Sequence, residues 1–159
     1  KTGFVKIFGE DFALHICYKN IKTLTVDLED ESIKIQLPNK YKKVAKEEMV
    51  EVLVEKIYKV IAKTEIERVM EKNRLLLGFA PEDYKLEKMS NTLGKCTQDK
   101  TIIINPEIVK YRPEVIEYVV LHEFCHLKYK THAKGFYEMI KKYEPNYETY
   151  ASEISGIQY

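Results

Sequence analysis

The chain has 159 residues, of which 45% are hydrophobic and 32% are charged, with 26 Lys and Arg against 25 Asp and Glu. This length suits a domain with a sizeable core, and the apolar fraction excludes a disordered chain. The net charge of +1 argues against a nucleic-acid partner, and no apolar run reaches the ~20 residues that a membrane helix needs.

The first forty residues have the pattern of β structure. Apolar and polar side chains alternate over 23–28 and again over 32–37, with an acidic Glu-Asp-Glu sequence between the two segments. This pattern predicts a hairpin whose second strand ends at Pro38. We therefore expect an N-terminal β region over 1–40 and a core over 41–159, packed as one compact unit.

Helical spacing replaces this alternation in the middle of the chain. Apolar residues over 46–71 recur at three- and four-residue intervals, which predicts one long amphipathic helix or two shorter ones. Gly78 and Pro81 then mark a turn. Beyond the turn, alternation and β-branched residues predict strands over 84–89 and 101–105. The segment between these strands, 91–100, is expected to be a loop or tight connection around Gly94.

Two helices are predicted in the last third of the chain. Pro113 stands where a helix would begin, and the many apolar residues after it predict a central, buried helix. A second helix is expected over 133–143, ending before Pro145.

The cysteines bear on the compartment. Cys17, Cys96 and Cys125 are odd in number and widely spaced, which is a poor framework for disulfides. Three reduced thiols and the absence of an apolar leader at the first residues predict a cytoplasmic protein.

His122-Glu123-Phe124-Cys125-His126 forms an HExxH motif inside the helix expected after Pro113. Residues four apart share a helix face, so both imidazoles can bind one metal ion, and neutral imidazole suits Zn²⁺. Glu123 is placed to accept a proton from a metal-activated water, as a general base. The motif therefore predicts zinc-dependent hydrolysis of peptide bonds.

A third protein ligand is needed, and His132 is the first candidate. Six residues separate it from His126, an offset that points about 240° away on a continuous helix. His132 can therefore join the site only if the helix ends near Tyr129 and Lys130 and the chain turns back. The alternative is a carboxylate on the next helix, where Glu138 is the nearest candidate.

Several segments resemble the YgjP-like metal-dependent hydrolases, relatives of the SprT-like and wider zincin metallopeptidases. The resembling segments are Leu93-Gly94-Lys95-Cys96, Thr101–Asn105, Pro113, Val115–Leu127, Thr131-His132, Phe136 and Pro145-Asn146-Tyr147. The resemblance implies an α+β fold with a zincin-like core, in which a small sheet packs on the HExxH helix. It also implies that His122, His126 and His132 are the zinc ligands and that Glu123 is the general base.

Two features of the resemblance bear on the substrate. Leu93 and Lys95 stand where the family has Trp and Ser, so Lys95 could place a charge near the cleft. In zincins the edge strand before the active-site helix commonly binds an extended peptide by strand addition. Thr101–Asn105 would be that strand, with an ordinary core strand as the alternative. For stabilising the oxyanion, Tyr129 and Tyr137 are near enough in sequence to be considered.

Two other functions remain open from the sequence. A metal-activated water also attacks phosphorus, so the same site could serve a nucleotide pyrophosphatase. The chain has no P-loop and no acidic cluster for Mg²⁺ and a polyphosphate, which favours a peptide or protein substrate. The second alternative is a non-catalytic binding module that zinc stabilises, in which a fourth protein ligand would close the site.

Overall fold

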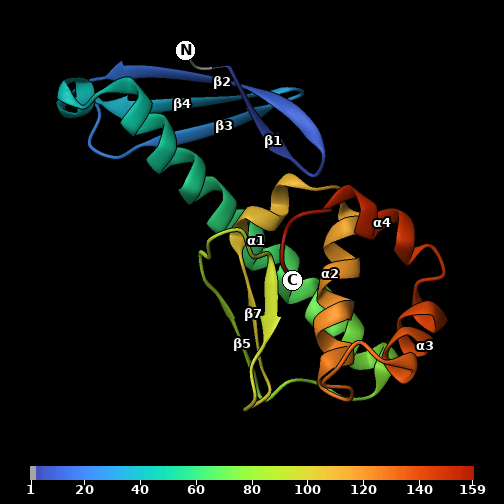
Figure 1. Ribbon diagram of the computed structural model, residues 1–159. Helices are drawn as coiled ribbons and strands as arrows, with labels where there is room; N and C mark the ends of the chain where they lie inside the picture. The colour runs from blue at the N-terminus through green and yellow to red at the C-terminus, as the bar shows by residue number, and fades with distance from the viewer. Residues whose placement is uncertain (1–2) are drawn as a thin grey trace.

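The computed structural model describes residues 3–159 as two small sheets joined by one long helix (Figure 1). The N-terminal sheet contains β1 (Phe4–Ile7), β2 (Glu10–Lys19), β3 (Thr25–Glu29) and β4 (Ser32–Pro38), in the order β1-β2-β4-β3. β2 and β4 run parallel, and the other neighbours run antiparallel. The predicted hairpin is confirmed as β3 and β4, because Glu29 pairs with Ser32 across a two-residue turn.

A second hairpin ties this sheet to the rest of the molecule. Phe8 and Gly9 connect β1 to β2, and both have positive φ, 53° and 86°, as a type I′ turn requires. Their amides donate to the carbonyls of Val109 and Lys110 at 2.7 and 2.8 Å. These acceptors end the short 3-10 helix η2 (Pro106–Lys110), so the turn is anchored on the core.

α1 (Lys46–Leu77) is a single uninterrupted helix of 32 residues. Its buried face is formed by Met49, Leu53, Tyr58, Ala62, Ile66, Val69, Met70 and Asn73. The helix ends at Gly78, which adopts a left-handed φ of 86° and donates its amide to the carbonyl of Arg74. α1 thus extends from the N-terminal sheet to the second sheet (Figure 1). Within residues 3–159, no helix is both long enough and apolar enough to cross a membrane.

The second sheet contains β5 (Asp83–Leu86), β6 (Gly94–Cys96) and β7 (Thr101–Ile104), in the order β5-β7-β6. One expectation is corrected here, and of two alternatives left open for 101–105 the core strand is found. The segment 91–100 is not a loop throughout, because the backbone of β6 pairs with β7 despite its poor strand propensity. β7 is not an edge strand, because it pairs on both sides. The free edge next to the helix that carries the HExxH motif belongs to β6.

Three helices complete the fold: α2 (Pro113–His126), α3 (Lys134–Tyr143) and α4 (Tyr147–Glu153). α2 and α3 confirm the two predicted helices, whereas α4 was not predicted. α2 is central, with Val115, Ile116 and all of 118–125 buried. The three cysteines are free thiols. The result is an α+β arrangement in which a small sheet lies beside the helix that carries the HExxH motif (Figure 1).

Candidate metal centre

α2 presents two imidazoles on one face. Pro113 occupies the first helical turn, where its missing amide has no cost, and helical spacing then aligns His122 with His126. His122 is buried and lies inside the cleft, whereas His126 is half-buried and lies nearer its mouth. Their ring centroids are 4.9 Å apart.

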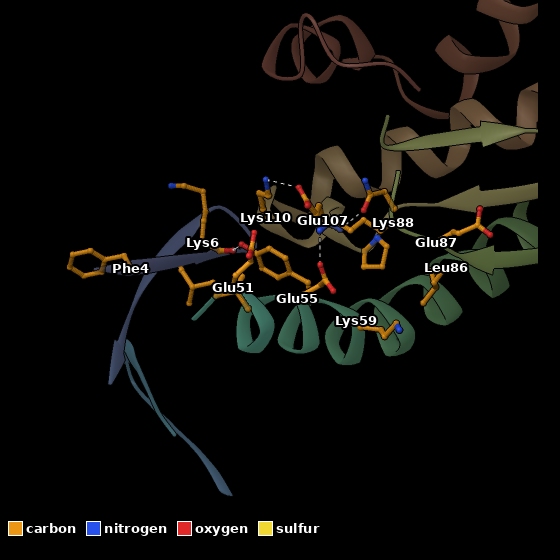
Figure 2. Close-up of a pocket in the computed structure, with 15 residues that line it drawn as sticks. Phe4, Lys6, Glu51, Glu55, Lys59, Leu86, Glu87, Lys88, Glu107 and Lys110 are labelled. Atoms are coloured by element: carbon orange, nitrogen blue, oxygen red, sulfur yellow. Dashed lines mark hydrogen bonds and ion pairs between the residues drawn. The ribbon is translucent and has the colours of Figure 1, made fainter. Parts of the chain in front are cut away.

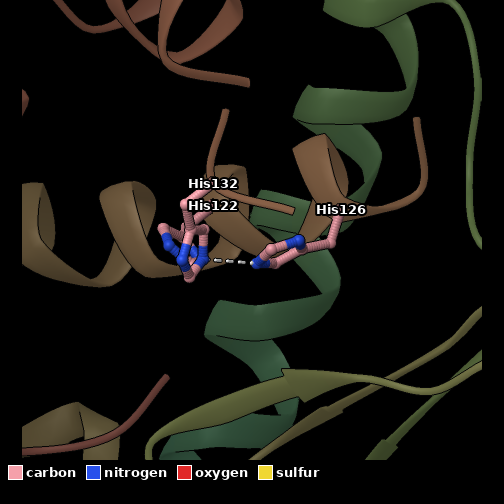
Figure 3. A group of neighbouring side chains, drawn as sticks. All are labelled: His122, His126 and His132. Atoms are coloured by element: carbon pink, nitrogen blue, oxygen red, sulfur yellow. Dashed lines mark hydrogen bonds between the residues drawn. The ribbon is translucent and has the colours of Figure 1, made fainter. Parts of the chain in front are cut away.

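The chain turns back directly after α2 and returns a third imidazole. The helix ends at His126, and a polar turn follows. This turn places Nε2 of His132 3.0 Å from Nε2 of His126. A hydrogen bond on the opposite side of the His126 ring fixes its orientation, because Nδ1 donates to the carbonyl of Tyr129 at 3.0 Å. Figure 3 shows the three imidazoles turned toward one another. One ligand atom from each lies within 4.8 Å of the others.

Phe136 of α3 packs against all three imidazoles. Its ring centroid lies 4.9 Å from that of His122, 4.6 Å from that of His126 and 4.9 Å from that of His132. The Phe136 side chain is fully buried. A rigid aromatic surface under the three rings restricts their orientation, so α3 contributes to the site without providing a ligand.

Glu123 lies at the bottom of the same cleft and is only 1% exposed. Burial raises its pKa to about 7, against the opposing influence of His126 and His132. Its Oε2 has no hydrogen-bond partner and lies 3.5 Å from Nδ1 of His122, which is also without a partner. Burial lowers the pKa of His122 to about 3, so its imidazole is neutral and the contact is not an ion pair.

Gly94 of β6 makes room for this carboxylate. A Cβ at Gly94 would lie 3.3 Å from both Cγ and Oε2 of Glu123, and 3.2 Å from Cδ1 of Ile104. Any larger residue would press on the Glu123 side chain. The strand and the helix therefore approach each other closely at the position of the carboxylate.

These residues suit a metal ion. Three imidazoles are a donor set typical of zinc, and the carbonyl of Tyr129 on the far side of the His126 ring is the kind of outer partner that orients such ligands. Two buried polar atoms at the site, Nδ1 of His122 and Oε2 of Glu123, have no hydrogen-bond partner. Within residues 3–159, this is the only group of three or more His, Cys, Asp or Glu that could hold a metal ion.

The other candidates from the sequence lie elsewhere. Glu138 is exposed, is near Lys134 and does not belong to the imidazole group. Tyr129 and Tyr137 are 39% and 40% exposed and do not line the cavity beside Glu123. That cavity, about 380 Å³, is lined by Lys95, Cys96, Thr97, Gln98, Glu123, His126, Lys130 and Tyr159.

Tyr159 is the residue that sequence reasoning missed. Its ring centroid lies 4.6 Å from that of His122, and its hydroxyl is 2.9 Å from the hydroxyl of Tyr118. Residues 157–159 reach the cleft by running beside 91–93, since Gln158 bridges Thr92 and accepts from the amide of Leu93. No local pattern in the sequence links positions 118 and 159.

A second groove lies between the N-terminal sheet and α1, away from the imidazoles. It measures about 550 Å³ and is lined by both charge signs, with ion pairs joining Lys88 to Glu55 and Lys110 to Glu107 (Figure 2). Its lining residues include no His or Cys. The carboxylates that line it, Glu51, Glu55, Glu87 and Glu107, do not form a group that could hold a metal ion among the described residues, so the cleft at α2 is the candidate site.

Comparison with known proteins agrees with this geometry. A family model described as "YgjP-like, metallopeptidase domain" matches residues 2–155, and no curated protein matches the chain. Two similar solved structures are the metallopeptidase zymogens of Pyrococcus abyssi abylysin and Methanocaldococcus jannaschii jannalysin, at 21% and 20% identity. Their TM-scores are 0.51 and 0.50. Each match covers 56% of this chain, and the matches cover 90% of the abylysin chain and 92% of the jannalysin chain. The expected zincin-like fold is confirmed.

Proposed function

Since the chain belongs to the YgjP-like metallopeptidase family, and is therefore a metal-dependent hydrolase, we propose that it cleaves peptide bonds at the cleft beside α2. The observation that carries this proposal is the convergence of three imidazoles next to one buried carboxylate. We assign the metal-binding role to His122, His126 and His132, and zinc is the ion that three imidazoles favour.

Bound zinc would lower the pKa of a water and polarise the scissile carbonyl. Glu123 accepts the proton of the attacking water on its free Oε2 as the oxygen bonds to the carbonyl carbon. The same carboxyl then delivers that proton to the leaving nitrogen when the C–N bond breaks. A raised pKa suits this exchange, since the carboxyl must both take up and release the proton.

Tyr159 supplies the missing donor for the developing oxyanion. Tyr159 lines the cavity that Glu123 lines, and its hydroxyl lies 2.9 Å from the Tyr118 hydroxyl. If Tyr118 donates to Tyr159, the proton of Tyr159 remains available for the substrate oxygen. Burial raises the pKa of both phenols, which keeps them protonated at neutral pH.

The substrate backbone would add to the free edge of β6. Lys95 pairs with Ile103 of β7, and the amide of Thr97 donates to the carbonyl of Thr101, the first residue of β7. Because bonding direction alternates along a strand, the backbone groups of Gly94 and Cys96 face the open edge. An extended peptide bonded there would lie between β6 and the imidazoles.

The test is hydrolysis by the purified chain with zinc, with chelator, and with zinc restored. An unfolded protein and nucleoside triphosphates serve as parallel substrates. We expect cleavage of the unfolded protein, loss with chelator and recovery with zinc. Turnover of nucleotides alone would replace the proposal with the pyrophosphatase function, and no turnover on either would leave a binding module.

A further inference from the structure

Lys95 is a charged residue on the strand that would hold the substrate. It is the middle residue of β6, it is exposed, and it lines the same cavity as Glu123 and His126. The ion pairs of residues 3–159 engage Lys6, Lys72, Lys88, Lys110 and Lys134. Lys95 is not among them, so its ammonium is free to interact with a ligand.

The position of Lys95 in the strand defines which substrate residue it would meet. The backbone of Lys95 bonds to β7, so a peptide that adds antiparallel to the open edge would meet Lys95 at a non-hydrogen-bonded position. Side chains at such positions approach most closely, and the residue directly opposite projects from the same face. One substrate side chain would therefore lie beside the Lys95 ammonium.

The charges around the cavity are mainly positive. Lys130 lines it from the turn after α2, is exposed, and also has no carboxylate partner among the described residues. Asp99 and Lys100 lie nearby on the rim, where Asp99 bonds to the hydroxyl of Thr97, and their opposite charges offset each other. Glu123 has the only carboxylate side chain among the residues that line the cavity, and it is buried.

We propose that Lys95, supported by Lys130, makes this enzyme selective for peptides with a carboxylate at the residue opposite Lys95. This inference rests on the proposed peptidase function. Opposite charges across two strands attract and like charges repel, so Asp or Glu is favoured at that position and Lys or Arg is rejected. The carboxylate is either an acidic side chain or the terminal carboxylate of a short peptide.

The chain offers a matched control for Lys95. Lys85 of β5 and Lys95 of β6 both pair with Ile103, so the two lysines occupy the same row on opposite edges of the sheet. Lys85 is equally exposed and lies outside the cavity at Glu123. Lys85→Glu makes the same charge change as Lys95→Glu, without placing it on the substrate strand.

In the experiment, the zinc-loaded chain first digests a proteome-derived peptide mixture, and mass spectrometry identifies the bonds that it cleaves. Quenched peptides with Glu, Gln or Lys at the selected position are then compared, each with a free and an amidated terminus. We expect kcat/KM to be about tenfold higher for Glu than for Lys. Lys95→Glu reverses this order, Lys85→Glu preserves it, and added salt weakens it.

The free and amidated termini separate the two sources of the carboxylate. Loss of cleavage on amidation assigns the subsite to the terminal carboxylate, and retention assigns it to the acidic side chain. Cleavage without charge preference, or an equal preference in Lys95→Glu, overturns the inference and leaves the peptidase function intact. Failure to cleave any peptide overturns the proposed function itself.

Discussion

The Nε2 atoms of His126 and His132 lie 3.0 Å apart, although the two residues belong to different segments of the chain. α2 ends at His126, and the turn that follows reverses direction within six residues. The carbonyl of Tyr129, in this turn, also holds the opposite side of the His126 ring. The end of the helix therefore brings the imidazole of His132 into place and orients that of His126.

Removing His132 should weaken metal binding. We expect His132→Ala to lower zinc affinity by more than about tenfold, because one of three ligands is lost. Zinc content after dialysis, measured by elemental analysis, checks this. His15→Ala is the control, since His15 is exposed on β2 and should retain full metal content. Equal zinc content in the two variants would remove His132 from the ligand set.

Gly94 should be needed for the correct position of the Glu123 carboxylate. A methyl group at Gly94 would lie 3.3 Å from Oε2 and Cγ of Glu123, and the Ile104 side chain blocks the other direction. We expect Gly94→Ala to reduce kcat by roughly 10- to 100-fold through misplacement of this group, with zinc content unchanged. Peptide turnover and metal analysis on the same preparation test this. Undiminished kcat would contradict the close approach of β6 to α2.

The Tyr159 hydroxyl should act in catalysis and not in metal binding. Tyr159→Phe retains the ring that packs on His122 but removes the proposed donor to the oxyanion. We expect kcat to fall by about 10- to 100-fold while KM and zinc content change little. Tyr137→Phe is the comparison, because Tyr137 stacks on Tyr147 outside the cavity. If both variants turned over peptide at the wild-type rate, the donor role would be wrong.

Much of this site was accessible from the sequence, because its residues are local. His122, Glu123 and His126 lie on one helical segment, where spacing alone defines the shared face. His132 required a turn after α2, and the structure contains that turn. The ligand roles themselves remain predictions. Helical spacing alone did not decide the position of His132, which is why Glu138 stayed open as the alternative ligand.

The features that were missed depend on long-range pairing. β6 has three residues with poor strand propensity, and only its hydrogen bonds to β7 make it a strand. The same pairing places β7 in the middle of the sheet and moves the open edge to β6. Tyr159 reaches His122 because residues 157–159 run beside 91–93. Patterns within one segment contain no information on which distant segment it meets.

Glu117 links the active-site helix to α1 and should make stability depend on pH. Burial opposes its ionisation, but hydrogen bonds from Lys72 and Arg68 outweigh this and lower its pKa. Because the folded-state pKa lies below the unfolded value near 4.5, the stabilisation is complete above that pH. It is lost as the pH falls through the folded-state pKa.

Glu117→Gln should therefore lower the free energy of unfolding by about 1 kcal/mol at pH 7, and by less in acid. Urea denaturation of wild type and variant at pH 7 and pH 3 gives this comparison. Glu71→Gln is the matched control, since Glu71 pairs with Arg74 on the exposed surface of α1 and should matter little. A loss of equal size at both pH values would show that the charge of Glu117 is not the cause.

The central claim is that Glu123 transfers the proton in hydrolysis without binding the metal. Glu123→Gln preserves the shape of the side chain and removes its basicity, and Glu138→Gln makes the same change at an exposed position outside the site. Zinc stoichiometry and peptide turnover, measured on one preparation of each variant, test this most directly. We expect full zinc in both variants, with kcat reduced by about 100-fold or more in Glu123→Gln alone. Full zinc with wild-type turnover in Glu123→Gln would contradict the account.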